Sequence, residues 1–368
     1  MPEPASLRCL HRRGAAAKVG GRQCQFKEIA VPSTVHMPSS PARSRRWMLA
    51  GLVAALFSGA PLPAGATPGP GAAEVESVTM LTTQRAAVIV RSPALARSVQ
   101  VQVLLPARTD RPRPTLYLLD GAGAGEESNY LESAWTQKTD AAAFFADKDV
   151  NVVLPVGGTG SFYTNWGRPD PTLGGGQWET FLTRELPPLI DAQFRGNGVN
   201  AVAGVSMGAH AALTLTARNS DLYRAVAAFS GCPDSAGPAS QLSVRATVAW
   251  KGGDADNMWG PDSDPRWAEH DPMRLAAALR GKAIYVSAGT GAPGPLDDPA
   301  SVDGLSAMTF GGQLEAAAMQ CTQRFAQRLT ELGIPAAVHL RPNGTHSWPY
   351  WQQDLRDAWP DLFAALER

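Results

Sequence analysis

Cysteine is scarce in this 368-residue chain, which contains four, two of them at Cys9 and Cys24 near the amino terminus. No spacing of cysteine and histidine matches a metal-binding motif, so the sequence gives no reason to expect a metal ion or a cofactor. The other pair, Cys232 and Cys321, is compatible with one disulfide in an exported protein and also with two separate buried thiols. Internal repeats are absent too.

An excess of charge of either sign is also missing. The chain has 33 basic and 33 acidic residues, but residues 1–66 hold nine basic and two acidic ones, which leaves 24 basic and 31 acidic residues in 67–368. A mildly acidic body does not suit a nucleic acid partner. With 44% hydrophobic and 18% charged residues, the length suits one large α/β domain or two small ones.

An apolar run long enough to span a bilayer comfortably is not found either. Residues 43–46 are basic, residues 47–60 are apolar, and residues 64–66 are the small residues Ala-Gly-Ala. This order is typical of a signal peptide, and the apolar run is shorter than a membrane span needs. We therefore predict cleavage after Ala66 and export to the cell envelope or medium; a retained membrane anchor is the alternative.

The predicted signal peptide divides the chain into an amino-terminal extension over 1–66, a flexible segment over 67–75 and a single domain over 76–368. The residues before Met37 are unusual for a signal peptide, so Met37 is an alternative start. Residues 44–49 resemble a twin-arginine export signal.

The stretch 201–213 organises the rest of the chain. A short apolar run leads into Gly-Val-Ser-Met-Gly at 204–208, and small residues with helical periodicity follow. This pattern predicts a strand, a sharp turn and a helix, with the Ser206 hydroxyl above the carboxyl edge of a sheet and the Met207 amide facing a developing oxyanion. A chance match in a chain with 36 glycines is the alternative, and the strand and helix around the motif favour the turn.

Strand-like and helix-like segments alternate along the domain. Strands are expected at 77–90, 98–105, 115–119, 150–155, the run before Ser206, 223–229, 282–288 and 336–340, the first two antiparallel at an edge. Helices are expected at 178–194 with a break at Pro187-Pro188, from the serine turn to 219, at 312–332 and at 348–366. Residues 231–271 are expected to be irregular with short helical pieces. The alternation implies a mainly parallel, doubly wound central sheet with helices on both faces.

A serine nucleophile requires a base and a carboxylate, which in this fold class follow the serine in the order acid, then histidine. Among the histidines after Ser206, His346 follows the last strand on a turn. His339 lies within that strand, His270 in the irregular segment and His210 on the helix after the serine. Position therefore selects His346 as the base.

The acid is less well defined by the residues themselves. Four candidates lie between the 282–288 strand and the histidine: Asp297, Asp298, Asp303 and Glu315. Spacing favours the aspartates, because they lie nearer the end of the strand, and each candidate on its own is typical of a solvated surface charge.

Several segments carry a more specific resemblance. They include Ser-Phe-Tyr-Thr-Asn-Trp at 161–166, Gly-Val-Ser-Met at 204–207 and Asn-Gly-Thr-His-Ser-Trp at 343–348. These residues resemble the mycolyltransferases of mycolate-producing actinomycetes, the secreted antigen 85 complex, over roughly residues 76–366. The resemblance implies an α/β-hydrolase fold, trehalose mycolates or related glycolipids as substrates, cell-wall arabinogalactan as a further acceptor, and fibronectin as a binding partner.

The resemblance also assigns residues. The family's catalytic glutamate lies in a Leu-Glu pair ten residues before a Phe, as Leu314-Glu315 precedes Phe325, which implies Glu315 as the acid beside Ser206 and His346. The remaining roles come by matched position: oxyanion amides from Ala122 and Met207, and substrate contacts from Asp120, Asp234, Arg324, Ser347 and Trp348. Gly123 stands where the family has an arginine that helps to bind the sugar.

These residues together predict a secreted serine acyltransferase that moves a mycolyl group through an ester on Ser206 to a sugar hydroxyl. A secreted carboxylesterase that releases acyl groups to water is one alternative, and the missing arginine at Gly123 is its best support. A cell-surface adhesion protein on an inactive hydrolase fold is another, which the presence of the serine, the acid and the base disfavours.

Overall fold

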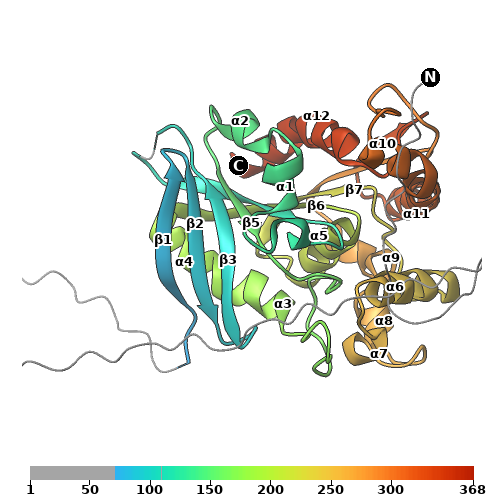
Figure 1. Ribbon diagram of the computed structural model, residues 1–368, viewed down its shortest axis with the longest axis horizontal. Helices are drawn as coiled ribbons and strands as arrows, with labels where there is room; N and C mark the ends of the chain where they lie inside the picture. The colour runs from blue at the N-terminus through green and yellow to red at the C-terminus, as the bar shows by residue number, and fades with distance from the viewer. Residues whose placement is uncertain (1–70, 109) are drawn as a thin grey trace, which may run out of the picture. The chain divides into compact units, whose positions relative to one another are not determined.

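The computed structural model describes residues 71–108 and 110–368 (Figure 1). The predicted signal peptide, its cleavage after Ala66 and the membrane-anchor alternative lie outside these residues, and the proposed boundaries of leader, flexible segment and domain stay predictions. The first strand begins at Glu74, near the end of the segment expected to be flexible. Within the described ranges, no helix has the length and apolar character of a membrane span.

The described residues build one sheet with the strand order β1-β2-β3-β5-β4-β6-β7-β8-β9. The strands are β1 (Glu74–Thr82), β2 (Arg85–Ser92), β3 (Arg97–Leu104), β4 (Arg113–Leu119), β5 (Asn151–Pro155), β6 (Gly196–Val205), β7 (Tyr223–Phe229), β8 (Ala283–Gly289) and β9 (Ala337–Arg341). Strands β4 to β9 pair in parallel, whereas β1, β2 and β3 form an antiparallel edge (Figure 1). The predicted mainly parallel sheet is thereby confirmed.

The single strand expected over 77–90 is wrong, because the chain folds back in its middle to form the β1–β2 hairpin. Thr82 ends β1, and its hydroxyl accepts a hydrogen bond from the Gln84 amide at 3.2 Å. A threonine hydroxyl can stabilise a turn in this way without glycine, proline or asparagine. The run looked continuous because it contains no glycine, proline, asparagine or aspartate, and because Thr82 and Thr83 also favour strands.

Helices cover both faces of the sheet (Figure 1). They are α1 (Ala134–Lys138), α2 (Ala141–Phe145), α3 (Trp178–Thr180), α4 (Leu186–Phe194), α5 (Met207–Arg218), α6 (Pro238–Trp250), α7 (Ala255–Met258), α8 (Arg266–Glu269), α9 (Pro272–Leu275), α10 (Val302–Ser306), α11 (Gly312–Glu331) and α12 (Trp348–Leu366). Strand β4 shows why two layers of helix are needed: Leu116 and Leu118 belong to the core cluster with α1, α2 and α12, while Tyr117 and Leu119 belong to the cluster with α4, α5 and α11. Successive side chains of a strand point to opposite faces, so an all-apolar strand must be covered twice.

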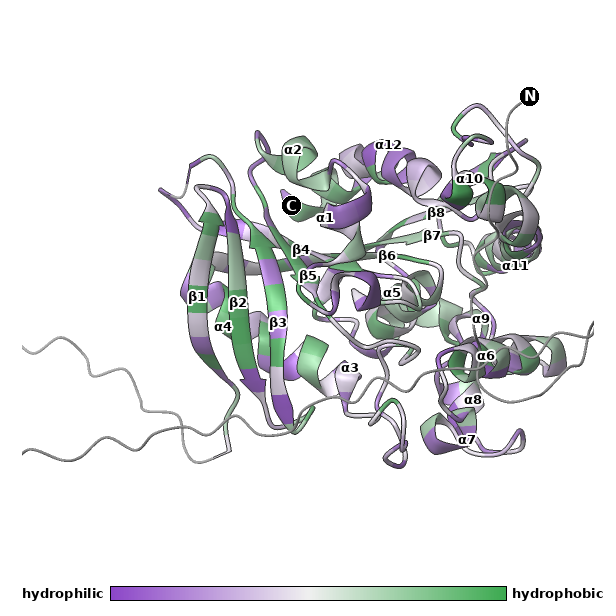
Figure 2. Cartoon of the chain, in the orientation of Figure 1, coloured by the Kyte–Doolittle hydropathy of each residue, from purple (hydrophilic) through white to green (hydrophobic). Residues whose placement is uncertain are grey.

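Hydropathy along the chain follows this arrangement. Strand β3, in the antiparallel part of the sheet, alternates apolar and polar bands (Figure 2).

The predicted strand over 223–229 and helix over 348–366 are confirmed residue for residue. The expected break in the 178–194 helix takes the form of a π-helical turn over Phe181–Glu185, after which both prolines lie in the first turn of α4. A proline lacks the N–H that would bond to the preceding turn, and the Leu182 carbonyl in that turn accepts from the Tyr223 hydroxyl at 3.4 Å.

The segment 231–271 is more regular than expected, because it contains the 13-residue helix α6. This helix buries only four side chains, Ser240, Gln241, Val244 and Val248, and two of them are polar. An apolar stripe is the main sequence signal for a surface helix, and here that signal is nearly absent.

Candidate active site

Ser206 lies on the turn between β6 and α5, with a backbone φ of 54° and ψ of −118°. A positive φ is uncommon for a residue other than glycine and marks strain. The flanking glycines explain how the turn fits: a Cβ on Gly204 would lie 2.3 Å from the Gly208 carbonyl oxygen, and a Cβ on Gly208 would lie 2.4 Å from the Asp120 carbonyl oxygen. The Gly-x-Ser-x-Gly pattern is therefore a packing requirement of this turn.

The structure brings Ser206, His346 and Glu315 into one hydrogen-bonded row. The Ser206 hydroxyl lies 2.9 Å from Nε2 of His346, and Nδ1 of the same ring lies 2.9 Å from Oε2 of Glu315. With Nδ1 donating to the carboxylate, Nε2 is left to accept the serine proton. The three residues come from the β6–α5 turn, the loop after β9 and the first turn of α11.

Glu315 is completely buried, and its other oxygen, Oε1, accepts three hydrogen bonds. The donors are the Ser230 hydroxyl at 2.8 Å, the Gly289 amide at 2.6 Å and Nη2 of Arg341 at 3.3 Å. These three residues lie at or just after the carboxyl ends of β7, β8 and β9. None of the three is predicted from the sequence, although a position at the end of a parallel strand is the signal that would have found them.

The acid is not one of the aspartates that spacing favours, because it is Glu315 that contacts His346. Asp297 lies close by but accepts hydrogen bonds from the Thr345 and Tyr350 hydroxyls, which hold the loop that carries His346. Asp303 lies 3.7 Å from Nζ of Lys138, at the surface.

Two backbone amides are available near the serine. Met207 is the first residue of α5, so its N–H has no intrahelical acceptor. Ala122 follows Gly121, where a Cβ would lie 3.6 Å from Cβ of Ser206, and the Ala122 carbonyl accepts from the Gly160 amide at 3.0 Å. Among the described residues, neither amide donates to another protein atom. Two such N–H groups can stabilise the negative oxygen of a tetrahedral intermediate formed when the serine attacks a carbonyl carbon.

Asp120 is not available to a ligand, which contradicts the expectation of a sugar contact there. Its side chain is fully buried and accepts hydrogen bonds from the Ser133 hydroxyl at 2.8 Å and the Ala134 amide at 3.0 Å. Burial raises the pKa of Asp120 to about 6, against the lowering effect of these hydrogen bonds. The carboxylate therefore anchors the start of α1 to the end of β4.

Asp234 and Arg324 lie together, with 3.9 Å between a carboxylate oxygen and a guanidinium nitrogen. A disulfide between Cys232 and Cys321 joins the two segments that carry them, which decides between the alternatives left open by the sequence. Arg324 is half exposed, and a Cβ on Gly123 would meet open space.

The last two predicted contacts, Ser347 and Trp348, directly follow His346 at the start of α12. The Ser347 hydroxyl lies 3.1 Å from that of Thr345. The Trp348 ring packs edge-on against Trp135 and Trp351, with ring centroids 5.4 Å and 5.0 Å apart. It therefore also contributes to the packing between α12 and α1.

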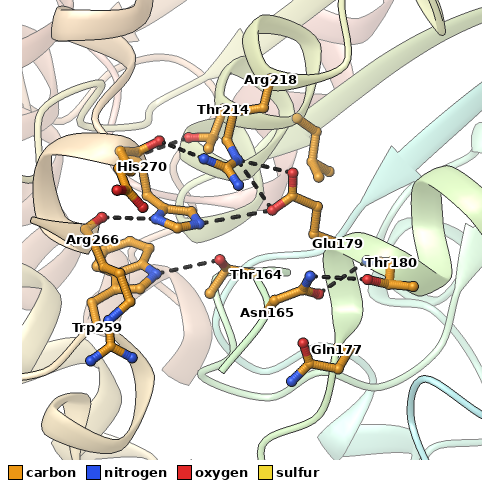
Figure 3. Close-up of polar contacts among 12 residues, drawn as sticks. Thr164, Asn165, Gln177, Glu179, Thr180, Thr214, Arg218, Trp259, Arg266 and His270 are labelled. Carbon is orange, nitrogen blue, oxygen red and sulfur yellow. Dashed lines mark hydrogen bonds and ion pairs between the residues drawn. The ribbon is translucent and has the colours of Figure 1, made fainter. Parts of the chain in front are cut away.

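The tryptophans of the 250–267 segment are mainly core residues. Trp259 and Trp267 are buried and only Trp250 is exposed, at 72%. Trp259 stacks on His270 at 5.2 Å, beside a polar network around Glu179 that Figure 3 shows. Two exposed apolar side chains lie around the start of α11: Phe310, just before the helix, is 75% exposed, and Leu314, in its first turn, is 59% exposed.

The described residues contain no group of three or more His, Cys, Asp or Glu side chains arranged to hold a metal ion.

The chain is similar in sequence to one family of known proteins. The sequence profile of the family described as "Putative esterase" matches residues 92–362. Diacylglycerol acyltransferase/mycolyltransferase Ag85C of Mycobacterium avium is 32% identical over 88% of this chain and 88% of its own length. The Ag85A protein of Mycobacterium tuberculosis strain H37Rv is 31% identical over 88% of this chain and 92% of its own length.

Solved structures show the same fold. The crystal structure of Mycobacterium tuberculosis MPT51 superimposes with a TM-score of 0.63 and 26% identity, covering 76% of this chain and 97% of that one. The serine hydrolase FphF of Staphylococcus aureus superimposes with a TM-score of 0.56 at 17% identity, covering 77% and 98%. The second likeness shows the fold alone.

Proposed function

Since this chain belongs to the putative esterase family and is a relative of the Ag85 diacylglycerol acyltransferase/mycolyltransferases, we propose that it is a serine acyltransferase that moves a mycolyl or similar long acyl group. The donor is a trehalose ester, and the acceptor is a second trehalose ester or a cell-wall sugar. The observation that carries the proposal is the row of hydrogen bonds from Ser206 through His346 to Glu315.

In the first half of the reaction the Ser206 oxygen attacks the carbonyl carbon of the donor ester. His346 takes the serine proton on Nε2, while Glu315 holds Nδ1 and stabilises the charged ring. The amides of Ala122 and Met207 bind the negative carbonyl oxygen of the tetrahedral intermediate. The intermediate then collapses: the bond to the sugar oxygen breaks, His346 returns the proton to that oxygen, and an acyl ester remains on Ser206.

In the second half a sugar hydroxyl takes the place of the leaving group. His346 removes its proton, the hydroxyl oxygen attacks the acyl-serine, and collapse regenerates the Ser206 hydroxyl. We assign acceptor contacts to Asp234, Arg324 and the residues after the histidine, Ser347 and Trp348. We further propose that the protein works outside the cytoplasm, after removal of the predicted signal peptide.

A carboxylesterase is the second candidate, and one observation favours it. The family's sugar-binding arginine is replaced by Gly123, and the space beside it is open. Loss of a bidentate donor weakens recognition of a sugar head group but leaves the acyl chemistry unchanged. Without a bound acceptor, water attacks the acyl-serine and the net reaction is hydrolysis.

The test uses the purified protein, trehalose monomycolate as donor and radiolabelled free trehalose. Transfer predicts label in the glycolipid fraction, and Ser206→Ala removes it. Free mycolic acid without labelled glycolipid, again dependent on Ser206, would select the esterase. Release or transfer that persists in Ser206→Ala would refute both reactions as written.

A further inference from the structure

Arg341 connects the Glu315 carboxylate to a second buried carboxylate. It is the last residue of β9, and β-sheet pairing places it opposite Gly289, whose amide also donates to Glu315. Its Nη2 lies 3.3 Å from Oε1 of Glu315, and its Nη1 donates to Oδ1 of Asp354 on α12. The side chains of Glu315 and Asp354 are 0% and 3% exposed, and that of Arg341 is 19% exposed.

The group of Arg341, Glu315 and Asp354 carries one net negative charge when both carboxylates are ionised. One guanidinium faces two carboxylates in a region that excludes most water, where interactions between charges are much stronger than at the surface. Burial raises the pKa of Asp354 to about 6, while Arg341 opposes that rise. The aromatic ring of Tyr350 lies under the guanidinium, 5.3 Å from its carbon, and fixes the plane of the fork.

Oxygen Oε1 of Glu315 is thus occupied by three donors, and only Oε2 is left for His346. The amide of Gly289 and the hydroxyl of Ser230 orient the carboxylate without adding charge. Arg341 does both, because its positive charge also opposes the charge that develops on the imidazole ring. Asp354 offsets part of that positive charge.

We propose that Arg341 is a positioning residue for the reaction at Ser206 and that Asp354 sets how strongly its charge acts on the Glu315–His346 pair. This inference rests on the proposed function, because it assumes that His346 is the base. Neither residue touches the serine, so both act through Glu315.

The other charged and titratable groups around Arg341 and Asp354 are unchanged between the parent protein and the variants compared below. Asp297 faces the histidine loop through Thr345 and Tyr350. Tyr285 from β8 and Asp357 from α12 lie on the Asp354 side. The disulfide on α11 has no thiol to titrate.

The experiment measures kcat/KM for hydrolysis of a short-chain p-nitrophenyl ester between pH 4 and 9. The acidic limb of this profile reports protonation of the essential base in the free enzyme. Arg341→Met removes a positive charge, which favours the protonated base, so the limb moves to higher pH by about one unit. Asp354→Asn removes a negative charge and leaves the arginine in place, so the limb moves to lower pH by about half a unit.

The two variants also differ in the plateau. Arg341→Met frees the carboxylate to rotate and lowers plateau kcat by about ten- to a hundred-fold with KM nearly unchanged, a loss typical of a residue that supports a catalytic group. Asp354→Asn keeps the plateau within about three-fold of the parent. A residue that only stabilised the fold would not move the two limbs in opposite directions.

Arg218→Met is the matched control, since Arg218 also binds a buried glutamate but contacts no member of the serine row. It leaves the acidic limb in place. Arg341→Lys keeps the positive charge without the bidentate guanidinium, and it replaces Arg341→Met if that variant fails to fold. In Arg341→Lys the acidic limb of the pH profile stays in place, while the plateau value of kcat falls. Shifts in the same direction for Arg341→Met and Asp354→Asn, no shift in either, or a full plateau in Arg341→Lys would overturn the inference.

Failure of the proposed function gives a different result. Hydrolysis that persists in Ser206→Ala would show that Ser206 is not the nucleophile, and the role assigned to Arg341 would fall with it. Hydrolysis that depends on Ser206 without any transfer to trehalose would refute only the proposed acceptor. The opposite shifts of the acidic limb would still test the roles of Arg341 and Asp354.

Discussion

Two buried glutamates in this molecule each face one arginine and one histidine, and only one of them lies beside a nucleophile. Glu179 on α3 accepts from Nε of Arg218 at 2.9 and 3.2 Å and lies 3.8 Å from Nε2 of His270 (Figure 3). Glu315 has the same kinds of partner in Arg341 and His346. A list of charged residues would not tell the two groups apart.

The second nitrogen of each histidine makes the difference. In His270, Nδ1 lies 2.8 Å from the carbonyl oxygen of Arg266, one turn earlier, and the ring is stacked on Trp259. In His346, the free nitrogen Nε2 faces the Ser206 hydroxyl. A glutamate, an arginine and a histidine can therefore stabilise the packing of helices or orient a general base. The partner of the histidine nitrogen that does not face the glutamate decides which.

The largest effect that would test this comparison is removal of each imidazole. His346→Gln lowers kcat by about ten-thousand-fold, as expected for loss of the base beside a serine nucleophile. His270→Gln leaves kcat within about three-fold and lowers the free energy of unfolding by about 1–3 kcal/mol. Ester hydrolysis and urea unfolding of both variants check this. Equal losses of kcat with intact folding would make the two histidines functionally alike.

Exchanging each carboxylate for an amide sharpens the same contrast. Glu315→Gln lowers kcat by about a hundred- to ten-thousand-fold, because the amide holds the ring less well and no longer stabilises its charge. Glu179→Gln leaves kcat nearly unchanged. Steady-state kinetics at pH 8 compare the two, with circular dichroism as the check on folding; a full rate in Glu315→Gln would contradict the assigned acid.

Acid stability separates the groups by a smaller amount. Burial raises the pKa of Glu179, but His270 and Arg218 outweigh it and bring that pKa down to about 2. A lowered carboxyl pKa stabilises the folded state above the unfolded pKa, near 4.5, and this stability is lost as pH falls through about 2.

Glu179→Gln lacks this contribution. The difference in unfolding free energy between parent and variant therefore shrinks by up to about 3 kcal/mol between pH 5 and pH 2. Urea unfolding at four or five pH values measures the difference. A difference that stays constant over this range would mean that the Glu179 network is not ionic in the folded protein.

The smallest effect concerns single neutral donors. Ser230→Ala removes the 2.8 Å hydrogen bond to Glu315 and leaves the indole N–H of Trp351 without its acceptor, so kcat falls about three- to ten-fold. Asn219→Ala removes a 3.2 Å hydrogen bond to Glu179 and leaves kcat unchanged. Both variants lose about 1 kcal/mol of stability. A lower kcat in Asn219→Ala alone would reverse the expected order.

The sequence was most informative where local geometry leaves little choice. Gly204 and Gly208 are forced by close backbone contacts, so the turn that carries Ser206 could be identified from five letters and their neighbours. His346 followed from its place after the last strand. The β1–β2 turn and helix α6 were missed because their residues carry no strong local preference.

The surroundings of Glu315 could not be derived in the same way. Ser230, Gly289 and Arg341 are far apart in sequence and meet only because parallel strands end at one edge. Glu315 itself was assigned by resemblance, while simple spacing favoured an aspartate. Asp120 shows the opposite error, since a residue in a matching motif proved to be buried under α1.

The disulfide has a topological consequence. It closes a covalent ring from Cys232 to Cys321, two residues with a sequence separation of 89. This ring contains β8 and Glu315, whereas the serine and the histidine lie outside it. A protease that cuts once inside the ring, for example in the exposed stretch around Val302, produces two polypeptide ends but still one molecule. Such nicked protein keeps its full mass on a non-reducing gel and separates into fragments only when a thiol is added.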